Sequence, residues 1–335
     1  MELKKIFNTG VLPHESNSQI AVNLPPDEVI FYNHSLQEIH KIDGYQLIGL
    51  SDKNALLRID RDIIFYSITN QKVTCEFKNT RIFPFPIDEN ILFTYRKSPT
   101  IELRDFSTAE TLWRTELTSV NRIVEGTCNS SYFIGNILDS LNKICIDMES
   151  GELKWQRNTS SFLDLDNKFA GRNYLLPNVL VSLGSSQDYF GVNIKNGEPL
   201  WHLDLEKQLK MSKVISDTNM FLFVREVNDV YLLKIDLSEG KILCKELLTE
   251  QIQRLQVYPQ GNTGTFGQLS YYDNQLFFGA NNQLVRLDLS SFKMEIIFEH
   301  TAEFYFSKVI GSKLFYSDNN FTTLVFELDS SNQET

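Results

Sequence analysis

The stretch that decides the fold reads Asp147-Met148-Glu149-Ser150-Gly151-Glu152-Leu153-Lys154-Trp155. It places a glycine four residues and a tryptophan eight residues after an aspartate, and Asn193, Gly197 and Trp201 repeat this spacing. Aspartate hydrogen-bonds its own backbone in turns, and glycine accepts a positive φ. The pattern therefore predicts a hairpin turn followed by an outer strand that carries an indole side chain.

The turn pattern recurs along most of the chain. We call the residue that opens each turn an anchor, and the anchors are Ser67, Asp105, Asp147, Asn193, Asp236, Asp288 and Asp329. Short β-branched and aromatic runs bounded by turn residues lie between them, as at residues 90–95 and 220–224. Intervals of roughly 40–50 residues are typical of one four-stranded blade of a β-propeller.

Seven anchors predict an all-β fold in which residues 1–335 form a single domain, a seven-bladed β-propeller of four-stranded antiparallel blades. No room remains for a fourth strand after Asp329, whereas residues 2–7 have the pattern of an outer strand. We therefore expect this N-terminal strand to complete the last blade and close the ring, which leaves no free edge. Residues 8–42 would be a long irregular entry into the first blade. The alternative is an eighth, degenerate blade built from residues 29–32 and 39–50.

Residues 147–155 and 193–201 resemble repeats of the pyrroloquinoline-quinone-type (PQQ-like) β-propellers. In that family the position of Trp113, Trp155 and Trp201 docks one blade against the next. Quinoprotein enzymes of this class have eight blades, bound calcium and a pair of adjacent cysteines over the cofactor. The four cysteines of this chain stand far apart, so the resemblance implies the fold and no cofactor.

Charge and composition limit the possible partners and the compartment. The net charge is −11 over 335 residues, and an acidic chain repels nucleic-acid phosphates. No signal-peptide pattern and no run of ~20 apolar residues is present, so we expect a cytoplasmic protein that does not enter membranes. The cysteines fit free thiols in a reducing compartment. We further expect a monomer.

The sequence offers no recognisable catalytic or metal site. The five histidines lack metal-ligand spacing, and the glycine-rich stretch 261–267 lacks the Gly-Lys-Ser/Thr ending of a phosphate-binding loop. Carboxylates are too numerous and scattered for spacing alone to nominate a catalytic pair. We therefore predict no catalytic residues, no metal and no cofactor, and a protein that is not an enzyme.

Two long connectors, residues 158–178 and 249–270, are expected to lie on one loop-rich face, where interface anchors gather. The candidate partner-binding residues are Phe162, Asp164, Asp166, Arg172, Tyr174, Asp188, Arg254, Tyr258 and Phe266. Alternatively, these aromatic side chains pack under the loops as a small satellite core.

The predicted function is a non-enzymatic protein-interaction module, a scaffold or an inhibitor, that binds a neutral-to-basic protein on its loop-rich face. Acidic residues at the rim would speed the approach of such a partner, and aromatic residues would supply most of the affinity. Two alternatives remain open at this point. One is a bacterial immunity-type protein that neutralises a basic toxin. The other is a propeller hydrolase or lyase with an axial site.

Overall fold

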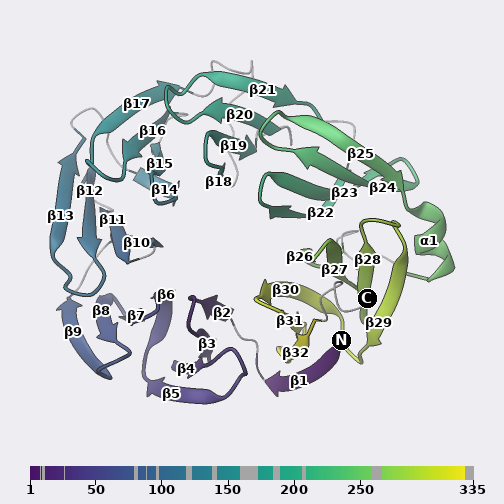
Figure 1. Cartoon of the computed structure of the whole chain (residues 1–335), viewed down its shortest axis with the longest axis horizontal. Coiled ribbons are helices and arrows are strands. Elements are labelled where there is room, and N and C mark those ends of the chain that lie inside the picture. The colour runs from purple at the N-terminus through teal and green to yellow at the C-terminus, as the bar shows by residue number, and fades with distance from the viewer. Residues whose placement is uncertain are drawn as a thin grey trace, which may run out of the picture. The chain divides into compact units, whose positions relative to one another are not determined.

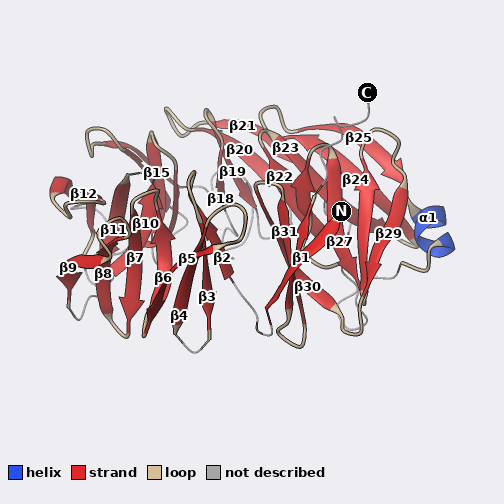
Figure 2. Ribbon diagram, turned by 60° about the horizontal axis from the view of Figure 1, so that its bottom comes forward, coloured by secondary structure: helices blue, strands red, loops and turns tan. Residues whose placement is uncertain are grey.

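The structure is a computed structural model that describes residues 1–7, 9, 12–25, 27–78, 82–87, 89–95, 98–117, 123–137, 142–158, 173–183, 189–205, 209–257 and 266–328. These residues form eight four-stranded antiparallel sheets and one short helix, α1(Thr249–Arg254) (Figure 2). The fold is thus an all-β β-propeller, as predicted, but it has eight blades, and the prediction of seven is wrong.

The chain divides into two compact units, which we describe separately. Unit 2 comprises His14–Leu205 and Ser238–Gly240 and contains five of the sheets. Their strands are β2(Leu12–Glu15), β3(Ile20–Leu24), β4(Glu28–Tyr32) and β5(Glu38–Asp43); β6(Gln46–Leu50), β7(Asn54–Ile59), β8(Asp62–Ser67) and β9(Lys72–Phe77); β10(Ile82–Ile87), β11(Asn90–Tyr95), β12(Thr100–Asp105) and β13(Thr111–Glu116); β14(Ile123–Cys128), β15(Tyr132–Ile137), β16(Asn142–Asp147) and β17(Leu153–Asn158); and β18(Asn173–Leu175), β19(Val179–Leu183), β20(Tyr189–Asn193) and β21(Pro199–Leu203). In each sheet the strands pair in chain order.

Unit 1 comprises Met1–Pro13, Glu206–Leu237 and Lys241–Thr335, and it contains three sheets. Their strands are β22(Leu209–Ser216), β23(Asn219–Glu226), β24(Asp229–Asp236) and β25(Lys241–Leu247); β26(Ser270–Tyr272), β27(Gln275–Ala280), β28(Gln283–Asp288) and β29(Met294–Glu299); and β30(Phe304–Ile310), β31(Lys313–Asp318), β32(Thr323–Glu327) and β1(Glu2–Phe7). The last sheet has the order β1-β32-β31-β30 (Figure 1). The N-terminal strand therefore completes the C-terminal blade, which confirms the predicted pairing.

The missed blade lies in residues 12–43, the segment predicted to be an irregular entry. The turn between β4 and β5 in this blade is one residue shorter than the turn of the other repeats. The pairing shows this: Phe31 pairs with His40, whereas the equivalent pair in the next sheet, Phe65 and Cys75, has one more residue between its members. Asn33 opens this turn, and its Oδ1 accepts hydrogen bonds from the backbone nitrogens of Ser35 (3.0 Å) and Gln37 (2.9 Å). The alternative of an eighth blade was correct in the number of blades. Its second range, 39–50, was wrong because it joins β5 to β6, which belongs to the next sheet.

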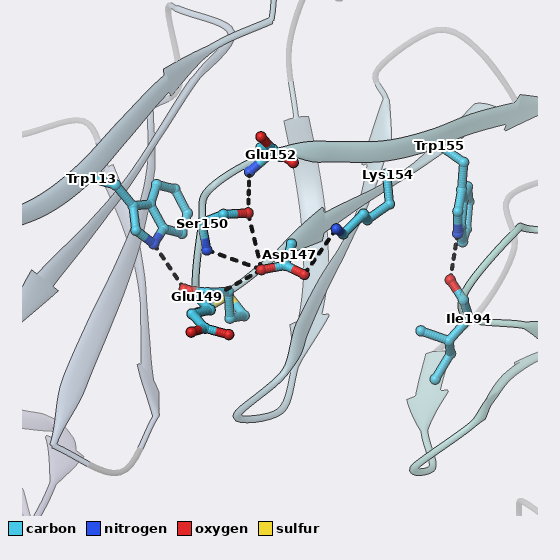
Figure 3. A network of polar contacts seen from close by, with 9 residues as sticks. Trp113, Asp147, Glu149, Ser150, Glu152, Lys154, Trp155 and Ile194 are labelled. Carbon is cyan, nitrogen blue, oxygen red and sulfur yellow. Dashed lines mark hydrogen bonds and ion pairs between the residues drawn. The ribbon is translucent and has the colours of Figure 1, made fainter.

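The predicted aspartate turns have the expected geometry (Figure 3). The Oδ1 of Asp147 accepts hydrogen bonds from the backbone nitrogens of Glu149 (3.1 Å) and Ser150 (3.0 Å). Gly151 follows at φ +74°, and its nitrogen donates to the carbonyl oxygen of Asp147 (2.9 Å). Lys154 adds an ion pair to the other carboxylate oxygen (3.2 Å). One carboxylate therefore holds both the turn and the start of the outer strand.

Asp147 makes a pH-dependent contribution to stability. Its pKa lies below the usual value because the backbone of Ser150 and the side chain of Lys154 favour the ionised form, despite partial burial. A lowered folded-state pKa stabilises the fold above the unfolded pKa of about 3.9. This contribution is lost as the pH falls through the folded pKa. Asp147→Ala should lower the free energy of unfolding by about 1–2 kcal/mol near neutral pH.

Asp147→Asn tests the charge separately, because Asn193 forms the same turn without charge and accepts from the nitrogen of Lys195 (2.9 Å). We expect the stability difference between the original chain and Asp147→Asn to shrink between about pH 6 and about pH 3, measured by urea unfolding. A difference that stays constant over this range would contradict the role of the charge.

The tryptophans join neighbouring sheets of unit 2. Trp113 Nε1 donates to the carbonyl oxygen of Met148 (2.8 Å), and Trp155 Nε1 donates to that of Ile194 (Figure 3). Trp155 is 7% exposed and packs in a cluster with Ile134, Cys145, Leu180, Phe190, Val192 and Ile194, which come from two successive sheets. The core therefore lies between the sheets, where each sheet buries its face against the next.

The glycine of each turn is required by the tryptophan of the preceding repeat. A Cβ on Gly151 would lie 2.7 Å from the Trp113 ring. The corresponding distances are 2.9 Å from Gly197 to Trp155 and 2.3 Å from Gly240 to Trp201. Where a repeat has cysteine at the tryptophan position, the next repeat has a residue larger than glycine at the glycine position. Ala109 corresponds in this way to Cys75, and Phe292 to Cys244. The glycine thus serves two needs, a positive φ and space for an indole.

Candidate functional site

One hollow in unit 2 has the size of a binding site. It is open to solvent, and its volume is about 860 Å³. We call it the acidic hollow, and it is lined by Glu15, Ser16, Asn17, His34, Leu50, Ser51, Asp52 and Glu89. The lining contains three carboxylates, one imidazole and one aliphatic side chain. It contains no lysine or arginine among the described residues.

Short turns of three successive sheets build the hollow. Ser16 and Ser51 each open the turn that follows the first strand of a sheet: their nitrogens donate to the carbonyl oxygens of Gln19 (3.0 Å) and Asn54 (2.8 Å). The side-chain amide of Gln19 then donates to the carbonyl oxygens of Ser51 and Asp52, both at 3.3 Å. Gln19 is 4% exposed, so this buried amide locks two turns of neighbouring sheets together.

Asp52 is held in place as an anion. Its carboxylate accepts hydrogen bonds from the backbone nitrogen of Ser18 (3.0 Å) and the side chain of Asn17 (3.3 Å). Partial desolvation raises its pKa, but the hydrogen bonds from Ser16, Asn17 and Ser18 outweigh that effect and leave the pKa below its usual value. His34 Nε2 lies 3.1 Å from the carbonyl oxygen of Asn17. The hollow therefore presents fixed negative charge at neutral pH.

The lining favours a cationic group that forms hydrogen bonds. Carboxylates accept from guanidinium and ammonium groups, and Leu50 provides an apolar wall for an aliphatic stem. Within the described part of the chain, no group of three or more His, Cys, Asp or Glu side chains is arranged to hold a metal ion.

Most of the sequence-predicted site residues lie outside the described residues: Phe162, Asp164, Asp166, Arg172, Asp188 and Tyr258. The structure describes the other three. Tyr174 is half-buried on β18, in unit 2, and Arg254 is exposed in the last turn of α1, in unit 1. Phe266 is only 3% exposed and packs against Phe223 (ring centroids 5.1 Å apart), so it is a core residue, as in the satellite-core alternative.

Sequence reasoning missed the acidic hollow. Glu15, Asp52 and Glu89 were among the scattered carboxylates that no motif distinguishes. A usable signal was their common position, at or just after the end of the first strand in three successive repeats. Recognising this signal requires knowing where the strands of the first blade begin and end, and the turn pattern did not identify that blade.

No protein-family model matches the chain, and no curated protein matches it in sequence. The comparison with solved structures shows the fold. The chain is similar to the computationally designed Ika8 protein, with 11% identity, TM-score 0.67 and 98% of each chain covered. It is equally similar to Saccharomyces cerevisiae Sqt1, with 12% identity, TM-score 0.67 and coverage of 98% and 99%.

A third similar structure is BamB from Moraxella catarrhalis, with 11% identity, TM-score 0.58 and coverage of 97% of this chain and 99% of that chain. BamB is a propeller of PQQ-like repeats, so this likeness agrees in fold with the repeat resemblance, although no sequence match confirms the repeat family. In the described part of the chain, no helix has the length and apolar character to cross a membrane.

Proposed function

We propose that the chain is a non-enzymatic protein-interaction module, a scaffold or an inhibitor, that binds a neutral-to-basic protein partner. The observation that carries this proposal is the acidic hollow, with three carboxylates and no cation in its described lining. The net charge of −11 adds a long-range field that speeds the approach of a basic partner. A neutraliser of a basic toxin is one form of this function.

The loop-rich face is a second and separate contact in the proposal, because the connector 158–178 leaves the sheets of unit 2 at the end opposite to the turns that line the acidic hollow. Acidic residues in and near the long connectors, Asp164, Asp166 and Asp188, would steer the partner, and Phe162, Arg172, Tyr174, Arg254 and Tyr258 would contact it. Phe266 is left out because its side chain is buried. No described observation favours a hydrolase or lyase site.

A hexa-arginine peptide provides a direct test of the acidic hollow. Isothermal titration at low salt should show binding that weakens as salt rises, because screening shortens the reach of the charges. The triple variant Glu15→Gln, Asp52→Asn, Glu89→Gln should bind the peptide at least about tenfold more weakly, equivalent to ~1.4 kcal/mol.

A matched control removes the same charge elsewhere in unit 2. Glu110, Glu149 and Glu152 are exposed residues outside the hollow, and their triple replacement by glutamine should leave peptide binding nearly unchanged. Equal weakening in both triple variants would show that net charge alone attracts the peptide. The acidic hollow would then not be the binding site.

A further inference from the structure

One imidazole lines the acidic hollow, at a position where other repeats have an apolar residue. His34 follows Asn33, which opens the turn between β4 and β5. The six anchors from Ser67 to Asp288 are followed by Ile68, Phe106, Met148, Ile194, Leu237 and Leu289. Four of these apolar residues are buried in the core: Phe106, Met148, Ile194 and Leu237. His34 is half-buried and borders the hollow instead.

The side chain of His34 joins two turns of its sheet. In other sheets a backbone nitrogen joins the turn between the third and fourth strands to the turn between the first and second, as from Met148 to the carbonyl oxygen of Ser131 (2.9 Å). In the first sheet, His34 Nε2 lies 3.1 Å from the carbonyl oxygen of Asn17. A carbonyl oxygen only accepts hydrogen bonds, so Nε2 carries the hydrogen, and a second proton binds at Nδ1.

The turn that carries His34 is held by its own hydrogen bonds. Asn33 Oδ1 accepts from the backbone nitrogens of Ser35 and Gln37, and Asn33 Nδ2 donates to Gln37 Oε1 (2.9 Å). The backbone nitrogen of Asn33 donates to the carbonyl oxygen of Gln37 (3.0 Å), and that of Leu36 donates to the carbonyl oxygen of Asn33 (2.9 Å). The backbone of this turn is therefore fixed, and moving the imidazole out of the hollow would break its bond to Asn17.

The other titratable groups that line the hollow are carboxyl groups from three sheets. Glu15 lies at the end of β2, Asp52 lies between β6 and β7, and Glu89 lies between β10 and β11. Carboxyl groups ordinarily titrate near about pH 4, whereas imidazole is the side chain whose charge changes between about pH 5 and about pH 8. Acidification across that range therefore changes the lining chiefly by adding one positive charge, on His34.

We propose that His34 makes the acidic hollow a pH-dependent binding site: the hollow binds a cationic group while His34 is neutral and releases it when His34 is protonated. This proposal rests on the function proposed above, because it concerns the same site. In neutral His34, Nδ1 is an acceptor for the N–H groups of a guanidinium or an ammonium. Protonation of Nδ1 replaces this acceptor with a donor and adds a charge of the same sign as the ligand. Both changes weaken the binding of a cation.

The first test titrates hexa-arginine into the original chain at about pH 8 and about pH 5.5, at equal ionic strength, and binding should be at least about threefold weaker at the lower pH. In His34→Gln this pH dependence should disappear, since glutamine keeps a neutral N–H donor for the carbonyl oxygen of Asn17 but takes up no proton. The matched control is His202→Gln, which removes an exposed imidazole from β21 in unit 2. It should keep the pH dependence of the original chain.

The second test measures the protons released on binding. Linkage is reciprocal, so if a proton on His34 weakens the binding of a cation, the bound cation favours loss of that proton. Calorimetric titration of hexa-arginine at about pH 6.5, in two buffers of different ionisation enthalpy, should therefore show proton release by the original chain and by His202→Gln. His34→Gln should release clearly fewer protons. A substitution that merely disturbed the shape of the hollow would weaken binding at both pH values without this selective loss of proton release.

Three results would overturn the role of His34: binding to the original chain that is as tight at the lower pH as at the higher, a pH dependence that His34→Gln retains, or proton release that His34→Gln retains in full. Each of them leaves the hollow as a cation-binding site. Absence of hexa-arginine binding at both pH values would instead contradict the function proposed for the hollow, and this proposal with it.

Discussion

Replacing Trp155 by alanine is expected to lower the free energy of unfolding by about 3–5 kcal/mol. The side chain is 7% exposed, it fills the space between two sheets, and its Nε1 donates to the carbonyl oxygen of Ile194. Alanine would leave a cavity there and also leave that carbonyl without its partner. Denaturant unfolding, followed by circular dichroism, measures the loss.

Trp155→Phe is the matched control. It keeps an aromatic ring between the sheets but removes the hydrogen bond to Ile194, so its loss should be clearly smaller than that of the alanine variant. A loss below about 1 kcal/mol for Trp155→Ala, or intrinsic fluorescence typical of a solvent-exposed indole at this position, would contradict the docking role.

Deleting residues 1–8 is expected to damage unit 1 severely. Strand β1 pairs with β32 from Glu2↔Glu327 to Phe7↔Thr323. Without β1, the edge of β32 is open beside a buried apolar row that includes Leu324, Val325 and Phe326. We expect aggregation, or a fall in melting temperature of about 10 °C or more, because an unpaired apolar edge strand templates association.

A synthetic peptide of residues 1–8 provides the complementary experiment. Added in excess to the truncated chain, it should pair with β32 and restore part of the lost melting temperature, since a ligand of the folded state stabilises it by mass action. A truncated chain that melts like the full chain would show that β1 does not contribute to stability.

The sequence predicted the repeat well where the turn chemistry was intact. Asp105, Asp147 and Asn193 open turns of the expected geometry, and β1 pairs as its outer-strand pattern indicated. The first blade was missed because its turn is one residue shorter. In the first blade, His40 occupies the position that tryptophan has in later repeats. Its ring stacks between Phe31 and Tyr66, and its Nε2 lies 2.7 Å from the Tyr66 hydroxyl.

The acidic hollow could not be predicted from the sequence to the same degree. Glu15, Asp52 and Glu89 are ordinary turn residues that lie far apart in the chain, and only the packing of three sheets brings them together. The buried amide of Gln19, which ties two of the turns together, has no sequence signature.

The match between each tryptophan and the glycine of the following repeat has a consequence for how such a chain changes by descent. Trp113 requires Gly151, Trp155 requires Gly197, and Trp201 requires Gly240. A repeat that is duplicated or moved alone therefore brings its tryptophan next to a turn without the matching glycine. Its own glycine turn is likewise placed beside a repeat without the matching tryptophan. Recombination is tolerated only when adjacent repeats are inherited together, or when a smaller side chain replaces the indole while a larger residue replaces the glycine, as at Cys75 and Ala109. The unit that must be inherited together is therefore the contact between two adjacent blades, and not a single blade.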